Sequence, residues 1–154
     1  RRFEVFNTKL ITHNQQLTTL KLISDYGHHP TEIKATLKAA REKFPDKRII
    51  LIFQPHQYQR TKLLFKDFVK SFDEADILIL NEIYGVAGRE QGKIISSKDL
   101  ANAVQKRRKE EKSVVFIKNI KEIPKFLAKI LKPNDVVIVM GAGDIYNLTL
   151  ELTK

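Results

Sequence analysis

Two hydrophobic patterns alternate along the chain. Short, almost entirely apolar runs are typical of strands covered on both faces, and they occupy residues 48–53, 77–80, 114–117 and 136–140. Apolar residues at helical spacing predict helices over 30–44, 61–72, 97–108 and 120–131, with a further strand at 17–24 and a short last helix. Strands and helices that alternate in this way form βαβ units. The sequence therefore predicts a single α/β domain, with a mostly parallel sheet and helices on both faces.

Residues near the helix ends refine these bounds. Pro30 suits a first helical turn, where its missing N–H has no intrahelical partner to lose, and Pro45 ends the same helix. Thr61 and Ser97 are expected to cap the N-termini of their helices. The opening segment Phe3–His13 is either a strand or a linker that leads in from another domain.

Composition narrows the class of protein. The chain has 154 residues, of which 42% are hydrophobic and 30% charged, the balance of one globular domain. It has no cysteine, which excludes disulfides, zinc ribbons and thiol catalysis. No apolar run approaches the roughly 20 residues of a membrane helix. The only methionine is Met140, so we expect a piece of a longer protein.

The charge favours an anionic partner. Lys and Arg number 28 against 18 Asp and Glu, for a net charge of +10. A nucleic acid and a small anionic substrate or nucleotide both suit this charge. Much of the excess lies on amphipathic helices, where a solvated face accounts for it, and no motif interleaves arginines with aromatic residues. These features make nucleic acid the less favoured partner.

Polar clusters follow four of the expected strands. They occupy residues 25–29, 56–60, 81–96 and 141–144. In sheets of this type, ligands bind outside the carboxyl ends of the strands. The four clusters are therefore expected to form one site at that edge.

The segment DYGHHP at residues 25–30 is the most unusual of these clusters. Gly27 permits a positive φ or a close backbone contact. One interpretation is a turn that begins a helix, in which the histidines only satisfy backbone groups. The other gives Asp25 a hydroxyl partner, such as a ribose, and His28 a polar or anionic ligand.

Arg60 places a cation at the start of an expected helix, where the macrodipole is already positive. An acidic residue would stabilise that helix better. A carboxylate ligand held by Arg60 and the free backbone N–H groups would resolve the conflict. We therefore interpret Arg60 as a binding residue.

Two glycine-containing segments match nucleotide motifs only in part. GAGD at 141–144 lacks the third glycine and the downstream βαβ unit of a dinucleotide fingerprint. GVAGRE at 85–90 lacks the Gly-Lys-Ser/Thr ending of a P-loop, which no segment of the chain supplies. If the parent protein uses ATP, its phosphate cradle lies elsewhere. The sequence predicts no metal site in this chain, and no residue that acts as a general acid or base.

Three segments together resemble the C-terminal domain of the Mur ligases, the ATP-dependent ligases of peptidoglycan synthesis. They are DYGHHPTEI at 25–33, FQPHQYQRT at 53–61 and MGAGDI at 140–145, in the family's order and spacing. The opening RRFE resembles the stretch that leads out of the family's central domain. The similarity spans nearly the whole chain and is greatest to the members that join L-alanine to UDP-N-acetylmuramate.

The resemblance implies a Rossmann-like domain at 17–154, with residues 1–16 leading in from a missing central domain. It implies that Asp25 holds the ATP ribose, and that the pocket for L-alanine and the acyl phosphate is lined by Tyr26, His28, His56 and Arg60. Gln57 stands where the family often has arginine, which removes one cation from this pocket.

The same resemblance implies a division of labour between domains. ATP and magnesium would be bound mainly by the missing central domain, and UDP-N-acetylmuramate by the missing N-terminal one. The enzyme would be cytoplasmic, and the present chain alone would be inactive. No role is implied for residues 81–96, which depart from the family's usual loop.

Two other functions stay open. The related ligases that recycle murein peptides resemble the chain too, although their first motif has an alanine-containing loop in place of Tyr26 and Gly27. A stand-alone α/β module that binds a nucleotide or a nucleic acid would also suit the charge. A receiver-like domain is disfavoured, because the chain lacks the acidic cluster that such a domain needs.

Overall fold

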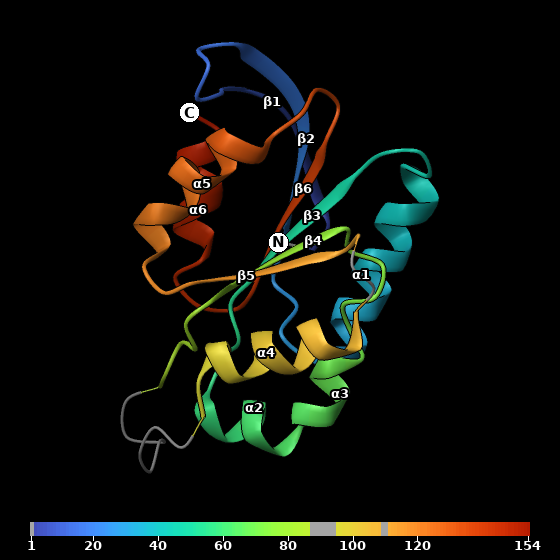
Figure 1. Ribbon diagram of the computed structural model, residues 1–154, viewed down its shortest axis with the longest axis vertical. Coiled ribbons are helices and arrows are strands. Elements are labelled where there is room, and N and C mark those ends of the chain that lie inside the picture. Colours follow the sequence, from blue (N-terminus) through green and yellow to red (C-terminus); the bar gives the residue numbers. More distant parts are fainter. Residues whose placement is uncertain (1, 87–94, 109–110) are drawn as a thin grey trace.

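The computed structural model describes residues 2–86, 95–108 and 111–154. Its centre is a six-stranded sheet in the order β1-β2-β6-β3-β4-β5, in which only β1 runs antiparallel to its neighbour (Figure 1). The strands are β1 Glu4–Ile11, β2 Leu17–Asp25, β3 Ile49–Phe53, β4 Ile77–Asn81, β5 Ser113–Ile117 and β6 Val136–Met140. The predicted α/β class with a mostly parallel sheet is confirmed.

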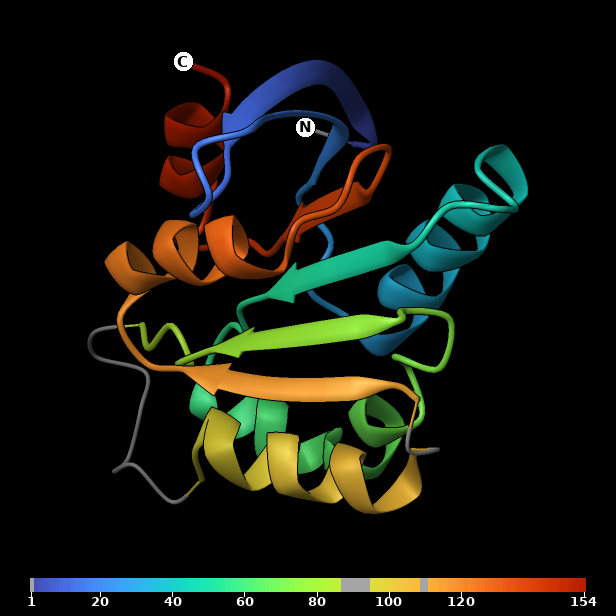
Figure 2. The same cartoon turned by 45° about the horizontal axis from the view of Figure 1, so that its top comes forward.

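Helices cover both faces of this sheet (Figure 2). They are α1 Pro30–Lys43, α2 Tyr58–Leu63, α3 Phe65–Val69, α4 Ser97–Arg107, α5 Ile123–Ile130 and α6 Tyr146–Leu152, with a 3-10 turn η1 at Ile120–Glu122. Apolar residues of α1, α3 and α4 form one core with the sheet, and those of α5 and α6 form the other. Among the described helices, none has the length and apolar character needed to cross a bilayer.

The central strands are apolar along their whole length because they face two cores. In β3, Ile49, Leu51 and Phe53 pack on the side of α1, whereas Ile50 and Ile52 pack on the side of α5. All five residues are fully buried. This explains why the sequence shows continuous apolar runs rather than alternation.

The opening segment contains a strand. β1 pairs with β2 over its full length, from Glu4 opposite Ser24 to Ile11 opposite Leu17. Its burial alternates between exposed and half-buried, as expected for an edge strand with one solvated face. Phe3, just before β1, has a φ of +52°, and its N–H donates to Asp25 Oδ2 at 3.0 Å.

Two predicted caps and one predicted helix are wrong in detail. Thr61 lies inside α2, where its hydroxyl donates to the Gln57 carbonyl at 2.8 Å. Ser96, not Ser97, caps α4, and its side chain accepts from the Asp99 N–H. The helix expected over 61–72 is broken at Leu64, where α2 ends and α3 begins. Phe68 of α3 is buried in the core, whereas Leu63 of α2 is 75% exposed.

The connections between strands explain how one edge collects four loops. From β2 to β5, each crossover returns over the face that carries α1, α3 and α4. The chain then crosses by α5 on the other face and inserts β6 between β2 and β3. Such a reversal leaves a crevice at the carboxyl ends of the strands. The segments after β2, β3, β4 and β6 all meet there.

Candidate functional site

Gln54 ties the carboxyl ends of three strands together. Directly after β3 and only 4% exposed, it donates through Nε2 to Asn81 Oδ1 at 2.9 Å and to Asp144 Oδ1 at 2.7 Å. Its Oε1 accepts from the Ile145 N–H at 3.2 Å. Asn81 in turn donates to the Ile117 carbonyl at the end of β5, at 2.8 Å. These bonds form a rigid amide frame beneath the loops.

The turn after β6 requires glycine at two positions. Gly141 has a φ of +151°, a backbone conformation that residues with a side chain rarely adopt. Its N–H donates to the Asp25 carbonyl at 3.1 Å. A Cβ at Gly143 would lie 2.6 Å from Gln54 Oε1 and 2.6 Å from Tyr84 Cγ. This segment is a close-packed turn between β6 and α6.

The carboxylate of Asp25 points toward the loop that follows β2. Its Oδ1 accepts from the Gly27 N–H at 2.7 Å, and its Oδ2 accepts from Phe3 and from the Thr36 hydroxyl at 3.0 and 3.3 Å. The side chain is 8% exposed. In this structure the carboxylate fixes the loop and the start of the chain.

The two histidines of the first motif have different surroundings. His29 caps α1, and its Nδ1 accepts from the Thr31 N–H at 3.2 Å. Glu32 completes the capping box by accepting from the backbone N–H groups of His28 and His29. Burial raises the pKa of Glu32, but those two N–H groups and the charges of His28 and Arg2 outweigh it, so the pKa lies below its usual value. His29 thus caps the helix, whereas Nδ1 of His28 lies 3.3 Å from the Tyr26 carbonyl and the His28 ring faces His56 of the next loop.

Four rings from three loops lie in series along this edge. Tyr26 meets His28 edge-on, with ring centroids 5.5 Å apart. His28 lies 5.7 Å from His56 at a tilt of 56°, and His56 stacks on Tyr84 at 5.7 Å and 14°. Such separations are those of favourable aromatic contacts. The series joins the loops after β2, β3 and β4.

Arg60 adds the positive charge of this site. It lies on α2, half-buried, and its Nη1 is 3.4 Å from His56 Nδ1 and 3.5 Å from the His56 carbonyl. Within the part of the chain that the structure describes, it has no acidic partner. Because α2 has only six residues, its dipole adds little, and the guanidinium itself is the main attraction for an anion.

The structure thus joins Tyr26, His28, His56 and Arg60 in one series of contacts and places Asp25 beneath them. Gln54, Asn81 and Tyr84 complete the site and were given no role by sequence reasoning. One signal was visible for Gln54 and Asn81: each is a polar residue at the end of a continuous apolar strand. Residues 87–94, most of the loop to which no role was assigned, lie outside the described residues.

The described residues do not form a metal centre. No group of three or more His, Asp or Glu side chains among them is placed to hold a metal ion.

Comparison with protein families gives one match that spans most of the chain. The model of the Mur ligase, glutamate ligase domain, matches residues 1–143. Over the aligned residues, which make up less than a third of each relative, two curated relatives are 41–42% identical to the chain. A UDP-N-acetylmuramate–L-alanine ligase of Desulforapulum autotrophicum is 42% identical over 130 residues, which cover 84% of this chain and 28% of the relative. One from Hydrogenovibrio crunogenus is 41% identical over 148 residues, covering 96% and 31%.

Solved structures agree with this match. The UDP-N-acetylmuramate-alanine ligase of Thermotoga maritima has a TM-score of 0.68 at 27% identity, over 88% of this chain and 26% of that one. A murein peptide ligase of Psychrobacter arcticus has a TM-score of 0.75 at 22% identity, over 99% and 29%. At that identity the second likeness concerns the fold alone. The chain spans less than a third of the length of these proteins.

Proposed function

The chain belongs to the Mur ligase family, and from this premise we propose that it is the C-terminal, amino-acid-binding domain of a ligase that joins L-alanine to UDP-N-acetylmuramate. In this proposal the whole enzyme is cytoplasmic and uses ATP to form the amide bond in peptidoglycan synthesis. Residues 1–16 lead in from its central domain. Identity of 41–42% to alanine ligases supports this assignment over other members of the family.

The observation that carries the proposal is the placement of Arg60. An arginine without an acidic partner in the described structure, beside His56 and at the meeting point of four loops, suits an incoming carboxylate. A guanidinium binds a carboxylate through two parallel N–H groups, which fixes the orientation of the amino acid. The rings of Tyr26, His28 and His56 then bound the space beside that carboxylate.

These residues would act by positioning and charge. In the proposed reaction, ATP converts the muramate carboxylate into an acyl phosphate and leaves as ADP. The alanine amine then attacks the acyl carbon, and phosphate departs. Holding an amine and an acyl group at attack distance contributes on the order of 7–11 kcal/mol from orientation. Arg60 and any protonated imidazole nearby would also stabilise the oxyanion that develops during the attack.

Activation of the carboxylate is assigned to the missing domains. The sequence has no P-loop ending, and the described residues include no cluster of three or more His, Asp or Glu side chains that could hold a metal ion. When bound, magnesium would neutralise the charge of the phosphates that react. We therefore expect the isolated chain to be inactive as a ligase and to bind ATP weakly at best.

We also propose that Asp25 binds the ribose of ATP, although its carboxylate already accepts hydrogen bonds within the fold. Its Oδ2 already accepts from the Phe3 N–H and the Thr36 hydroxyl. A ribose hydroxyl would have to share or replace one of these donors.

The test is the choice of amino-acid substrate by the full-length protein. We expect ADP to form when ATP, UDP-N-acetylmuramate and L-alanine are all present, and no ADP above background without L-alanine. ADP formation with a murein tripeptide in place of L-alanine would instead assign the protein to the recycling ligases. Binding of a random oligonucleotide that falls steeply with salt, without either ligase activity, would favour the nucleic-acid module.

A further inference from the structure

Tyr84 is the one ring of the series that the proposed function leaves without a role. It follows β4 by three residues and is 38% exposed. We propose that Tyr84 is a positioning residue: it holds His56, and through His56 the Arg60 guanidinium, in the orientation that receives the amino-acid carboxylate. This inference rests on the proposed function and adds a residue to it.

The backbone of Tyr84 restrains the turn before α2. Its N–H donates to the Pro55 carbonyl, and its own carbonyl accepts from the Gln57 N–H, both at 2.8 Å. His56 and Tyr84 thereby form an isolated parallel bridge beyond the ends of β3 and β4. Gln57 has a φ of +71°, a conformation that persists in a non-glycine residue only where its surroundings hold it. The bond to Tyr84 is such a restraint, and α2 with Arg60 begins at the next residue.

The side chain of Tyr84 restrains the imidazole itself. The two rings lie nearly parallel, at 14°. The ring also lies against the turn after β6, since a Cβ at Gly143 would come within 2.6 Å of its Cγ. The ring is therefore packed between the loop after β3 and the loop after β6. Glycine at position 143 is the residue that leaves room for it.

Arg60 depends on this support because its own contacts are weak. Its hydrogen bonds to His56 are long, at 3.4 and 3.5 Å, and no ion pair with a described residue fixes it. An arginine side chain that samples many rotamers loses more entropy when it binds a ligand. With His56 held by Tyr84, the guanidinium is placed before the carboxylate arrives.

The experiment compares two substitutions at Tyr84 in the full-length ligase. Tyr84→Phe keeps the ring, and the Tyr84 hydroxyl makes no hydrogen bond to a described residue, so we expect its kinetics to stay within about twofold of wild type. Tyr84→Leu removes the stack, and kcat/KM for L-alanine should fall by about 10- to 100-fold, the usual cost of a misplaced binding group. The KM for ATP should not change, because the loss concerns the amino-acid site.

A second variant keeps the inference testable if Tyr84→Leu does not fold. Tyr84→Met keeps an apolar side chain of similar length but has no ring to stack on His56, and it should also lower kcat/KM for L-alanine without raising the KM for ATP. Wild-type kinetics in Tyr84→Leu would overturn the inference. So would equal losses for both substrates, or a loss in Tyr84→Phe as large as in Tyr84→Leu.

Failure of the inference and failure of the proposed function give different results. A wild-type protein that forms no ADP with L-alanine contradicts the proposed function, and the inference falls with it. A wild-type protein active on L-alanine, beside a Tyr84→Leu variant of equal activity, contradicts the inference alone.

Discussion

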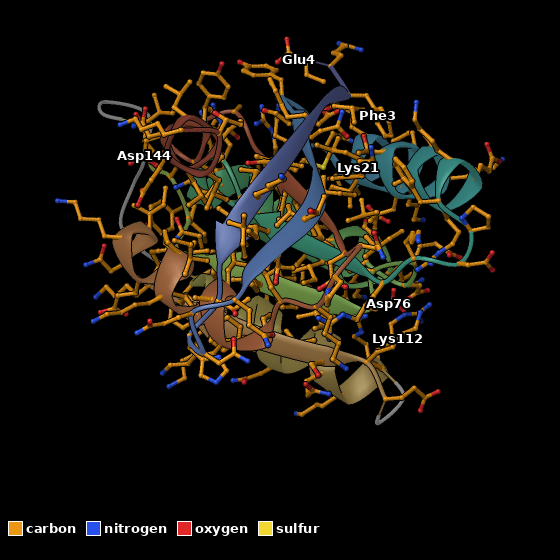
Figure 3. The ribbon with its side chains drawn as sticks, turned by 90° about the horizontal axis from the view of Figure 1, so that it is seen from above. Phe3, Glu4, Lys21, Asp76, Lys112 and Asp144 are labelled. Atoms are coloured by element: carbon orange, nitrogen blue, oxygen red, sulfur yellow. The ribbon has the colours of Figure 1, made fainter. Side chains whose placement is uncertain are left out.

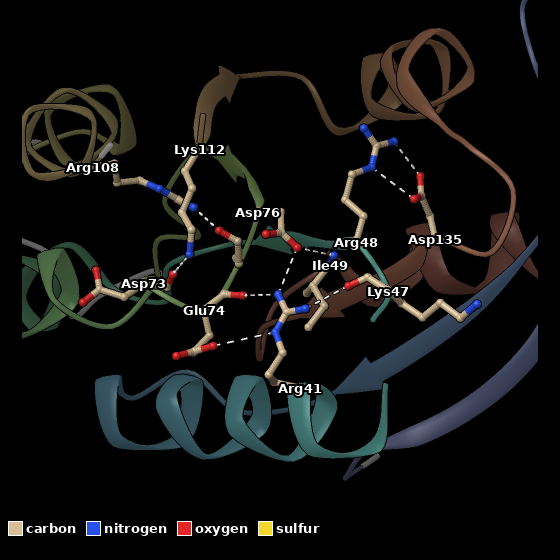
Figure 4. A network of polar contacts seen from close by, with 11 residues as sticks. Arg41, Lys47, Arg48, Ile49, Asp73, Glu74, Asp76, Arg108, Lys112 and Asp135 are labelled. Carbon is tan, nitrogen blue, oxygen red and sulfur yellow. Dashed lines mark hydrogen bonds and ion pairs between the residues drawn. The ribbon is translucent and has the colours of Figure 1, made fainter. Parts of the chain in front are cut away.

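The two edges of the sheet differ in how they treat charge. At the amino edge, directly before the strands, acids and cations pair with each other (Figure 4). Arg48 Nη2 lies 2.6 Å from Asp135 Oδ2, and Arg41 Nη2 lies 2.9 Å from Asp76 Oδ2. Both arginines also donate to backbone carbonyls, so their charge is satisfied within the fold.

At the carboxyl edge, the carboxylates of Asp25 and Asp144 accept from uncharged donors, and the cation Arg60 forms no ion pair with a described residue. Gln54 joins Asn81 to Asp144 there, and Arg60 has only an imidazole and a carbonyl beside it among the described residues. Figure 3, from above, shows Asp144 on one side of the molecule and Asp76 with Lys112 on the other. Arginine thus forms ion pairs within the fold at one edge, whereas at the other edge Arg60 forms none with a described residue.

A second feature of the amino edge is a cavity whose lining is mostly charged. The cavity has a volume of about 440 Å³ and is lined by Asp73, Arg107, Arg108, Glu111 and Lys112. Arg107 is paired with Asp73, and Arg108 and Lys112 donate to the carbonyls of Ala75 and Asp73. Arg107 and Arg108 thereby hold the end of α4 to the segment before β4, although Arg108 Nε and Nη1 are buried without a hydrogen-bond partner among the described residues.

The largest effect should follow from breaking the buried pair at the amino edge. Asp135→Ala leaves Arg48 without its carboxylate, and the Lys132 N–H also loses its acceptor. Removing one partner of a buried pair costs about 3–5 kcal/mol. Urea unfolding should show this loss, while kcat/KM for L-alanine in the folded variant stays near wild type. A stable Asp135→Ala protein would contradict the division between the edges.

An intermediate effect is expected for the amide frame, the one part of the carboxyl edge that also stabilises the fold. Gln54→Ala leaves Asn81 Oδ1 and the Ile145 N–H without their partner. Each buried group left unsatisfied costs about 1–3 kcal/mol. We expect both the unfolding free energy and kcat/KM to fall. A matched control is Asn102→Ala on the exposed side of α4, and equal stability of the two variants would exclude a frame role for Gln54.

The response to acid sharpens the comparison, because each edge has a carboxylate with a lowered pKa. The hydrogen bond from Arg107 lowers the pKa of Asp73 despite partial burial, and backbone N–H groups lower that of Glu32. A carboxylate whose pKa is lower in the folded protein than in the unfolded chain stabilises the fold. This stabilisation is complete above the pKa of the unfolded chain, near 4.5 for Glu32, and is lost as the pH falls through the pKa of the folded protein.

Thermal unfolding between pH 5 and 3 measures this contribution. Glu32→Gln keeps an oxygen that can accept the capping bonds but has no charge to titrate, so its midpoint should fall less on acidification than that of wild type. Asp73→Asn should behave in the same way at the other edge. A wild-type midpoint that does not change over this range would contradict both assignments.

The smallest effect is expected where a pair is exposed. Arg107 and Asp73 are about half exposed, so Arg107→Ala should lower the free energy of unfolding less than any of the substitutions above. Its activity should equal that of wild type, since it lies at the amino edge. High salt should reduce even this small difference in stability. A loss of activity in Arg107→Ala would show that the amino edge is not only structural.

The sequence predicted the strands and most helices because their periodicity is set by burial on two faces. It missed the break at Leu64 because the apolar spacing of residues 61–72 looks continuous, although Leu63 points to solvent. It placed two caps one or more residues too late, since Ser96 and Ser97 both suit the position and Gln57 is an unusual N-cap.

The site was predicted only as far as local motifs reach. Tyr26, His28, His56 and Arg60 lie within two short segments, and those segments meet as expected. The contacts of Tyr84 with His56 and with Gly143 depend on the order of the strands, which places β6 beside β3. No local pattern encodes that order, so Tyr84 becomes visible only in the folded structure.

The most direct test of the account is Arg60→Ala in the full-length ligase, with kcat/KM for L-alanine and the thermal midpoint measured on the same preparation. Losing a charge-assisted contact to the alanine carboxylate should reduce transition-state stabilisation by about 2–5 kcal/mol. The midpoint should stay at the wild-type value, because no acid in the described structure pairs with Arg60. Arg60→Lys should restore only part of the activity, since an ammonium cannot form the two parallel bonds. Wild-type kinetics in Arg60→Ala, or a fall in midpoint large enough to explain the lost activity, would contradict the assignment of this edge to the ligand.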